Sequence, residues 1–103
     1  FTYIDDIVTG IRSSMASDSK NEVFNLGSQT KVDLKYVISI IEKKLKKKAI
    51  IRYVDIQPGD VKASLADIHS SHKKLNYKPM TSIEEGLPLF IDWYLDYKEL
   101  SVK

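Results

Sequence analysis

The turn Gln57-Pro58-Gly59-Asp60-Val61 holds the clearest candidate ligand of the chain. A Pro-Gly pair marks a turn, and this one follows the apolar run 49–54 and precedes a predicted helix. A carboxylate fixed on a turn between two apolar elements is either a polar loop tip or a group placed to hold a ligand. The residue types and their spacing leave both interpretations of Asp60 open.

Two histidines and two acidic pairs are further candidates for metal binding or acid–base chemistry. His69 and His72 share one face of a predicted helix, but two ligands do not make a metal site, and we expect Asp67 to cap that helix. The pairs Asp5-Asp6 and Glu84-Glu85 each stand at a predicted helix start, where carboxylates cap the helix and oppose its dipole. We therefore expect structural roles and no metal.

A run of lysines closes the second predicted helix. Cations suit the negative end of the helix dipole, so a solvated face is favoured over a phosphate or nucleic acid site. The net charge of +2 adds no argument for a nucleic acid partner. The run comprises Lys43, Lys44, Lys46, Lys47 and Lys48.

Periodicity of the apolar residues predicts the elements that must position these groups. We expect helices at about 6–16, 32–46, 67–75 and 82–98, and short strands at 1–4, 22–27 and 49–54. The order β-α-β-α-β-α-α indicates an α/β layering, or α+β for an isolated piece, because three short strands are too few for a doubly wound sheet.

Single residues are expected to begin or bend three of these helices. Asp5 and Asp67 are suitable N-caps, and Ser82 with Glu85 forms an S-x-x-E capping box. Pro88 lies inside the last helix and should kink it, because proline removes one ladder bond.

Composition points to an ordinary globular chain of one domain. It has 103 residues, no cysteine and no long apolar run, so disulfides, thiolate metal sites and a membrane partner are not expected and a cytoplasmic location is the default. The chain starts at Phe1 inside a predicted strand, which leads us to expect a piece of a longer protein.

The four glycines, Gly10, Gly27, Gly59 and Gly86, do not form G-x-G-x-x-G, so the chain lacks the dinucleotide-binding fingerprint. Tyr94 and Lys98 have the spacing of a tyrosine whose pKa is lowered by a lysine one turn on. About one such pair is expected by chance at this composition, so we do not assign it a catalytic role.

Five stretches, taken in order, resemble the C-terminal part of the extended short-chain dehydrogenase/reductases, within the NAD-dependent nucleotide-sugar epimerase/dehydratase family. "FTYIDDIVTGI" resembles the segment after an Arg-Asp pair, "VFNLG" a Tyr-Asn-(Ile/Leu)-Gly strand, and "QPGDV" with the later "AD" a Pro-Gly-Asp-Val loop. "LNYKPMTSIEEGL" resembles a Leu-Gly-Tyr-x-Pro-x-Thr-Ser-(Leu/Ile)-Glu-Glu-Gly run, and "WYLDY" an aromatic tail. The branch most similar is that of the UDP-glucuronate 4-epimerases.

The resemblance implies the UDP-sugar-binding part of a 4-epimerase. In such enzymes NAD takes a hydride from C4 of the sugar and returns it to the other face, while a Tyr/Lys pair of an N-terminal Rossmann domain moves the proton. That machinery has no counterpart here, so the resemblance implies no catalytic and no cofactor-binding residue in this chain.

Four residues match substrate-binding positions of the family. Asp60 matches the acid that accepts hydrogen bonds from the ribose hydroxyls, a role in which one carboxylate can accept two bonds. Gln57 stands where an arginine often holds the diphosphate, and glutamine there is typical of the glucuronate branch. Leu34 matches a residue that packs on the uridine, and Phe1 an aromatic beside the diphosphate.

The family pattern also divides the chain. Residues 1–27 are expected to pack on the absent Rossmann domain and residues 28–103 to form the substrate-binding lobe. Separated from that domain, the chain should expose apolar surface and self-associate or be only marginally stable.

Asn76 replaces a family glycine near a helix end, where asparagine tolerates the left-handed conformation. The alternative is a free-standing α/β module that binds a nucleotide or a protein without catalysis.

Overall fold

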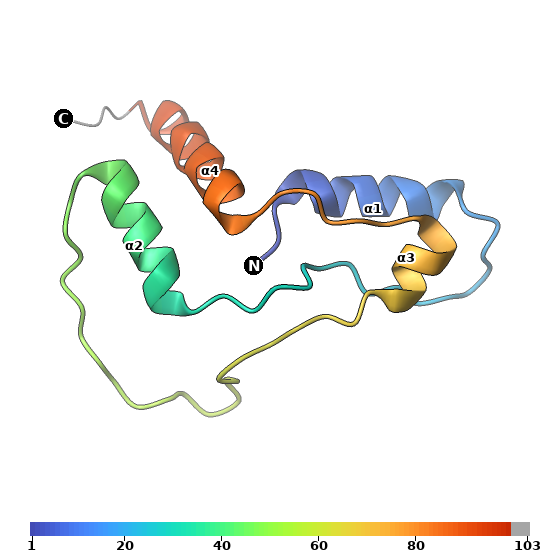
Figure 1. Cartoon of the computed structure of the whole chain (residues 1–103), viewed down its shortest axis with the longest axis horizontal. Helices are drawn as coiled ribbons and strands as arrows, with labels where there is room; N and C mark the ends of the chain where they lie inside the picture. The colour runs from blue at the N-terminus through green and yellow to red at the C-terminus, as the bar shows by residue number, and fades with distance from the viewer. Residues whose placement is uncertain (100–103) are drawn as a thin grey trace.

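A computed structural model describes residues 1–99, which form four helices joined by long irregular segments (Figure 1). The helices are α1 (Ile4–Ala16), α2 (Leu34–Leu45), α3 (His69–Leu75) and α4 (Ile83–Tyr97). The four expected helices are thus confirmed, within a few residues at their ends. None of the helices in the described part is long and apolar enough to cross a membrane.

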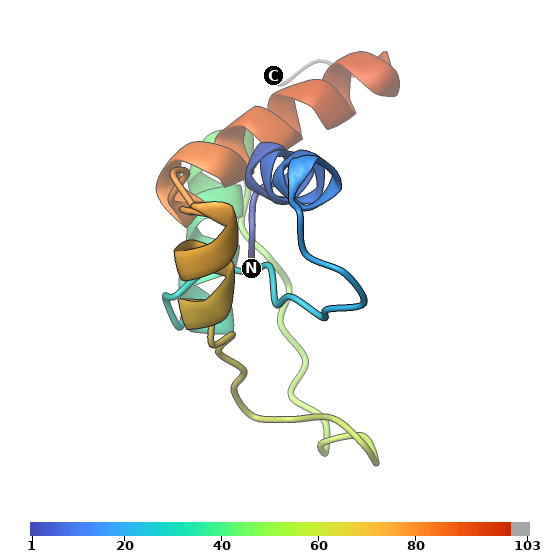
Figure 2. The same cartoon turned by 90° about the vertical axis from the view of Figure 1, so that its right-hand side faces the viewer.

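The helices pack as two pairs, α1 against α3 and α2 against α4 (Figures 1 and 2). The buried core lies at the first pair, where Ile68, Leu75 and Tyr77 pack with the half-buried Phe24, Leu26 and Ala66. Gly10 allows α1 to approach this core, because a Cβ there would lie 2.7 Å from Leu26 Cδ2. At the second pair, Val37 of α2 and Ile91 of α4 are buried.

The helix ends follow the predicted chemistry at some positions and depart from it at others. Asp67 is not the N-cap of α3, which is Ile68, but its Oδ1 accepts the backbone N–H of His69, the first residue of that helix, at 3.0 Å. Asn76 adopts the left-handed conformation at the end of α3, with φ 53°. Asp5 is not the cap of α1, which begins at Ile4, two residues earlier than expected, with Tyr3 as its N-cap. Ser82 precedes α4 without a side-chain capping bond. α4 continues through Pro88 without interruption.

The two to three expected strands are not present in residues 1–99. A strand exists only when its backbone pairs with a neighbour; residues 22–27 and 49–54 have none, and the expected strand 1–4 already enters α1 at Ile4. Residues 22–27 are held instead by side chains: the Ser71 hydroxyl donates to Asn25 O, and the Tyr77 hydroxyl donates to Gly27 O at 3.0 Å.

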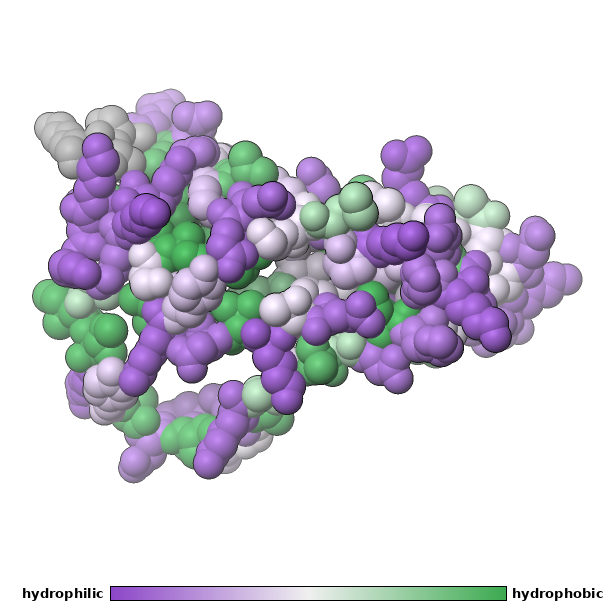
Figure 3. Space-filling model, in the orientation of Figure 1, coloured by the Kyte–Doolittle hydropathy of each residue, from purple (hydrophilic) through white to green (hydrophobic). Residues whose placement is uncertain are grey.

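The segment 46–65, called the outer segment below, has no packing of its own. All of its residues are exposed, and Ile50 is as accessible as in an extended chain at 102%. In Figure 3 the segment stands apart from the body of the molecule and carries several apolar residues. Its β-branched residues explain why the sequence predicts a strand, and the lack of a neighbour explains why none forms.

Candidate functional site

The outer segment presents Asp60 at the tip of a closed turn. The backbone N–H of Asp60 donates to Gln57 O at 3.1 Å, and Gly59 has φ 89°. A proline at the second position and a positive φ at the third position are the features of a type II turn. Glycine adopts a positive φ without strain. Both Gln57 and Asp60 are exposed, so the turn offers a carboxylate and an amide to a ligand from one rigid support.

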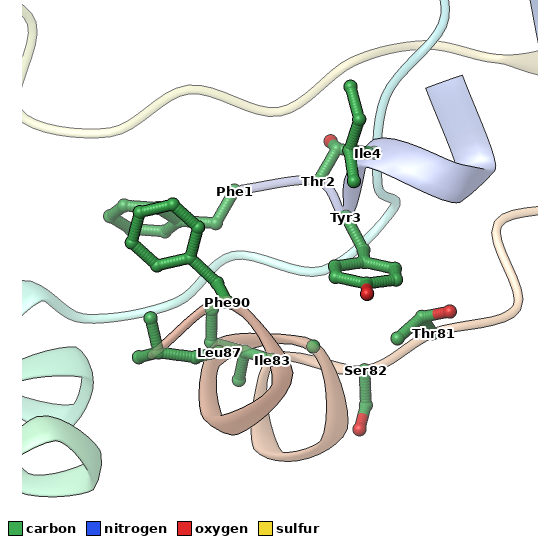
Figure 4. Close-up of a pocket in the computed structure, with 10 residues that line it drawn as sticks. Phe1, Thr2, Tyr3, Ile4, Thr81, Ser82, Ile83, Leu87 and Phe90 are labelled. Atoms are coloured by element: carbon green, nitrogen blue, oxygen red, sulfur yellow. The ribbon is translucent and has the colours of Figure 1, made fainter. Parts of the chain in front are cut away.

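A first cavity of about 230 Å³ lies between the start of the chain and the start of α4 (Figure 4). Phe1 and Tyr3 form one wall, and Ile83 and Phe90 contribute to the opposite wall. In Figure 4 the Phe1 and Phe90 side chains lie at the same end of the cavity, and the Tyr3 ring covers the first turn of α4. Apolar and aromatic side chains dominate this lining, so it suits a flat or apolar group.

A second cavity of about 530 Å³ adjoins the first and is more polar. It lies between residues 28–33, which lead into α2, and residues 79–84, which lead into α4, with Phe1 again in its wall. Tyr36 of α2 lines this second cavity, and its hydroxyl donates to Glu84 Oε1 of α4 at 2.8 Å. Leu34 lies directly after its lining at the first position of α2 and is 64% exposed.

The Tyr36–Glu84 bond shifts both groups away from their ordinary titration. The hydrogen bond to Glu84, assisted by partial desolvation, raises the pKa of the Tyr36 phenol. The pKa of Glu84 is lowered, first by its own backbone N–H at the start of α4 and then by the Tyr36 hydroxyl. Glu84 is therefore a carboxylate at neutral pH, and Tyr36 remains a neutral donor.

One acidic residue holds the wall that the two cavities share. Asp6 is 6% exposed, and its Oδ1 and Oδ2 accept the backbone N–H groups of Met80 at 2.9 Å and of Thr81 at 3.0 Å. The expected role of the Asp5-Asp6 pair as a local cap is thus wrong for Asp6, which bonds a segment 74 residues away. The sequence carries no local signal for such a partner.

The structure brings the four predicted substrate residues together only in part. Gln57 and Asp60 close one turn, and Phe1 lies in the walls of both cavities with Leu34 directly beside the second. Neither Gln57 nor Asp60 lines these two cavities, because the outer segment stands away from the body. The sequence indicated Glu84 only as a helix-start acid and did not indicate Tyr36, and only the packing of α2 on α4 makes the two neighbours.

The histidines and the lysine run, which were the other candidates, take part in contacts within the fold. Within residues 1–99, no cluster of three or more acidic or histidine side chains could hold a metal ion. The His72 Nδ1 lies 3.3 Å from Tyr77 O. In the lysine run, Lys44 pairs with Asp92 of α4 at 2.6 Å, and Lys48 pairs with Glu42 at 3.2 Å.

Comparison with known proteins assigns this arrangement to a class. No protein-family model matches the chain. It is 39% identical over 101 residues to the UDP-glucuronate 4-epimerase of Thermodesulfobacterium geofontis, with 97% of this chain and 31% of the relative covered. It is 38% identical over 117 residues to UDP-glucuronate 4-epimerase 1 of Arabidopsis thaliana, covering 100% of this chain and 27% of the relative.

A solved structure agrees with these relatives. The UDP-glucuronic acid 4-epimerase of Bacillus cereus, in complex with UDP-glucuronic acid and NAD, superimposes with a TM-score of 0.86 at 30% identity. The match covers 94% of this chain and 32% of that enzyme. The chain thus spans about a third of the length of its relatives.

Over nearly its whole length the chain is therefore similar to the C-terminal part of nucleotide-sugar epimerases. The particular enzymes it matches are the UDP-glucuronate 4-epimerases.

Proposed function

We propose that this chain is the nucleotide-binding portion of an NAD-dependent UDP-glucuronate 4-epimerase and is not catalytic by itself. The observation that carries the proposal is its match, over 94% of its residues, to an enzyme solved with UDP-glucuronic acid and NAD. In the proposed complex Asp60 accepts the ribose hydroxyls, Gln57 and Phe1 lie at the diphosphate, and Leu34 packs on the uracil ring.

The chemistry of the turn 57–60 supports this assignment. A ribose presents two neighbouring hydroxyl donors, and a carboxylate can accept both. Asp60 is exposed on a turn that Pro58 and Gly59 favour, so its carboxylate is accessible to a ligand. A neutral Gln57 beside it provides a weaker diphosphate contact than an arginine would.

The residues of this chain do not fit a nicotinamide dinucleotide. No two of its four glycines are close enough to form the phosphate-binding loop. In the proposal an N-terminal domain therefore binds NAD and supplies the hydride chemistry. This chain binds the UDP part of the substrate.

Exposed apolar surface supports a domain partner of this kind. Along α1 the residues Ile4, Val8, Ile11 and Met15 recur at helical spacing, and they are 45–81% exposed. The outer segment adds unpaired backbone with apolar side chains. In the proposed enzyme both surfaces pack on the N-terminal domain.

A chimaera tests the proposal. The C-terminal third of the Bacillus cereus enzyme is replaced by this chain, and conversion of UDP-glucuronate to its C4 epimer is measured. We expect activity, with the sugar nucleotide consumed only when the chain is present. A well-folded chimaera that binds NAD but neither binds nor converts UDP-glucuronate would refute the proposal.

The role of Asp60 is tested in the same chimaera. Asp60→Ala removes charge-assisted bonds worth about 1.5–3 kcal/mol, so KM for UDP-glucuronate should rise about 10- to 150-fold with NAD affinity unchanged. Asp55→Ala is the matched control, because Asp55 is an exposed carboxylate of the same outer segment. Equal KM values for the two variants would exclude Asp60 as the ribose ligand.

A further inference from the structure

The peptide that Asp6 holds forms a wall of both cavities. Thr81 lines the first cavity and the second, and so does Phe1. Met80, the other residue bonded to Asp6, lines the second cavity. The position of this peptide therefore affects the shape of both cavities.

Two more contacts tie the start of the chain to the same frame. The Tyr3 ring packs so closely on Gly86 of α4 that a Cβ there would lie 2.9 Å from Tyr3 Cδ2. Thr2 Oγ1 accepts the backbone N–H of Ser28 at 3.0 Å. Phe1 directly precedes these residues, so its place follows from contacts made by residues 2, 3 and 6.

Asp6 is the charged and buried member of this set. A buried carboxylate is costly unless hydrogen bonds replace its hydration, and here both oxygens are used by consecutive amides. Neither bond serves the helix that carries Asp6. Its neighbour Asp5 occupies the same first turn and is exposed, so a carboxylate favourable to the helix dipole is already present without Asp6.

We infer that Asp6 is a positioning residue for nucleotide binding, which clasps residues 80–81 and thereby places Phe1 against the start of α4. The inference rests on the proposed function, in which Phe1 lies at the diphosphate. Asp6 does not touch the nucleotide; it acts through the wall that it holds. Asp6 itself is not a member of the core cluster of Ile68, Leu75 and Tyr77.

The first experiment compares Asp6→Asn with Asp5→Asn in the chimaera. Each variant removes one charge from the first turn of α1, but only Asp6→Asn places an amide N–H₂ against a backbone donor. We expect KM for UDP-glucuronate to rise about tenfold or more in Asp6→Asn with kcat within about twofold, and wild-type values in Asp5→Asn. A purely structural role would reduce the amount of active enzyme and lower kcat at constant KM, which would overturn the inference.

The second experiment needs no activity and uses the full 103-residue chain. Amide hydrogen exchange and nuclear Overhauser contacts are measured for the wild type and Asp6→Asn. We expect faster exchange at Met80 and Thr81 and a weaker contact between the Tyr3 ring and Gly86 of α4, while the Tyr77 amide, bonded to Ser71 O, keeps its protection. Unchanged exchange and an unchanged ring contact would overturn the inference.

The two experiments separate the inference from the proposed function. An inactive chimaera together with the expected changes in the chain would refute the epimerase function and retain Asp6 as the residue that places Phe1. An active chimaera with equal KM values in both variants would retain the function and overturn the role of Asp6.

Discussion

The buried phenol of Tyr77 offers a direct test of the packing. Tyr77 is 2% exposed, and its hydroxyl donates to Gly27 O at 3.0 Å. Tyr77→Phe keeps the ring in the core and removes only this bond. Because Gly27 is buried, its carbonyl oxygen would lose a partner without gaining water, which costs about 1–3 kcal/mol.

The same group predicts a dependence on pH. Burial, and next the charge of Asp6, raise the pKa of Tyr77 above 10.0, the ordinary value, although the bond to Gly27 O opposes this. A raised folded-state pKa gives stability that is fully present below the unfolded pKa and is lost as pH rises through the folded one. Wild-type stability should therefore fall above pH 10, by at most about 1.4 kcal/mol per pH unit for this group.

Urea unfolding followed by far-UV circular dichroism at neutral and alkaline pH measures both effects. We expect Tyr77→Phe to be about 1–3 kcal/mol less stable at pH 7 and to lose part of the alkaline decline. Tyr53→Phe is the control, because Tyr53 is 75% exposed and its loss should change stability by less than about 0.5 kcal/mol. Equal neutral stability of the two variants would refute the buried bond, and an unchanged alkaline slope would refute the raised pKa.

Three further predictions concern helix packing and exposed surface. Gly86→Ala gains about 1 kcal/mol in helix propensity, but its Cβ would lie 2.9–3.2 Å from three Tyr3 atoms; we expect net destabilisation of about 1–2 kcal/mol in urea, and a more stable variant would contradict this contact. Lys44→Ala should cost less than about 1 kcal/mol, because the Lys44–Asp92 pair is partly exposed at 32% and 55%; a larger loss in the same assay would contradict a solvated pair. The isolated chain should self-associate through its exposed apolar side chains, and Ile51→Lys should reduce this in sedimentation experiments, whereas a monomeric wild type would contradict it.

Short sequence patterns predict the helices of this chain because a helix is determined mainly by residues that are close in the sequence. Apolar residues at helical spacing give the bounds of α1, α2 and α4 to within a few residues. The left-handed conformation of Asn76 and the bond of Asp67 to the His69 N–H also depend on neighbours within one turn. Each of these features is decided by residues that are adjacent in the sequence.

The absence of the strands and the bonds of Asp6 to residues 80–81 could not be predicted in the same way, because both depend on distant partners. Residues 49–54 have strand composition, yet composition cannot supply the second strand that a sheet requires. Asp6 has the residue type and position of a helix-start acid, and its bonds to Met80 and Thr81 arise only when α1 packs beside the approach to α4. A carboxylate in a first turn is thus consistent with two roles that only tertiary structure separates.

The separation of Asp60 from Phe1 has the same origin. The turn 57–60 is shaped by its own Pro58 and Gly59, whereas its distance from the cavities is set by an outer segment that is exposed along its whole length. The backbone of residues 49–54 is extended and rich in β-branched residues, so it lacks only a pairing partner to become a strand. In the proposed enzyme, pairing of residues 49–54 therefore moves no bond within the turn, but it fixes where Asp60 stands relative to Phe1. Nucleotide affinity should accordingly depend on the joined domain even though none of the four predicted substrate residues belongs to it.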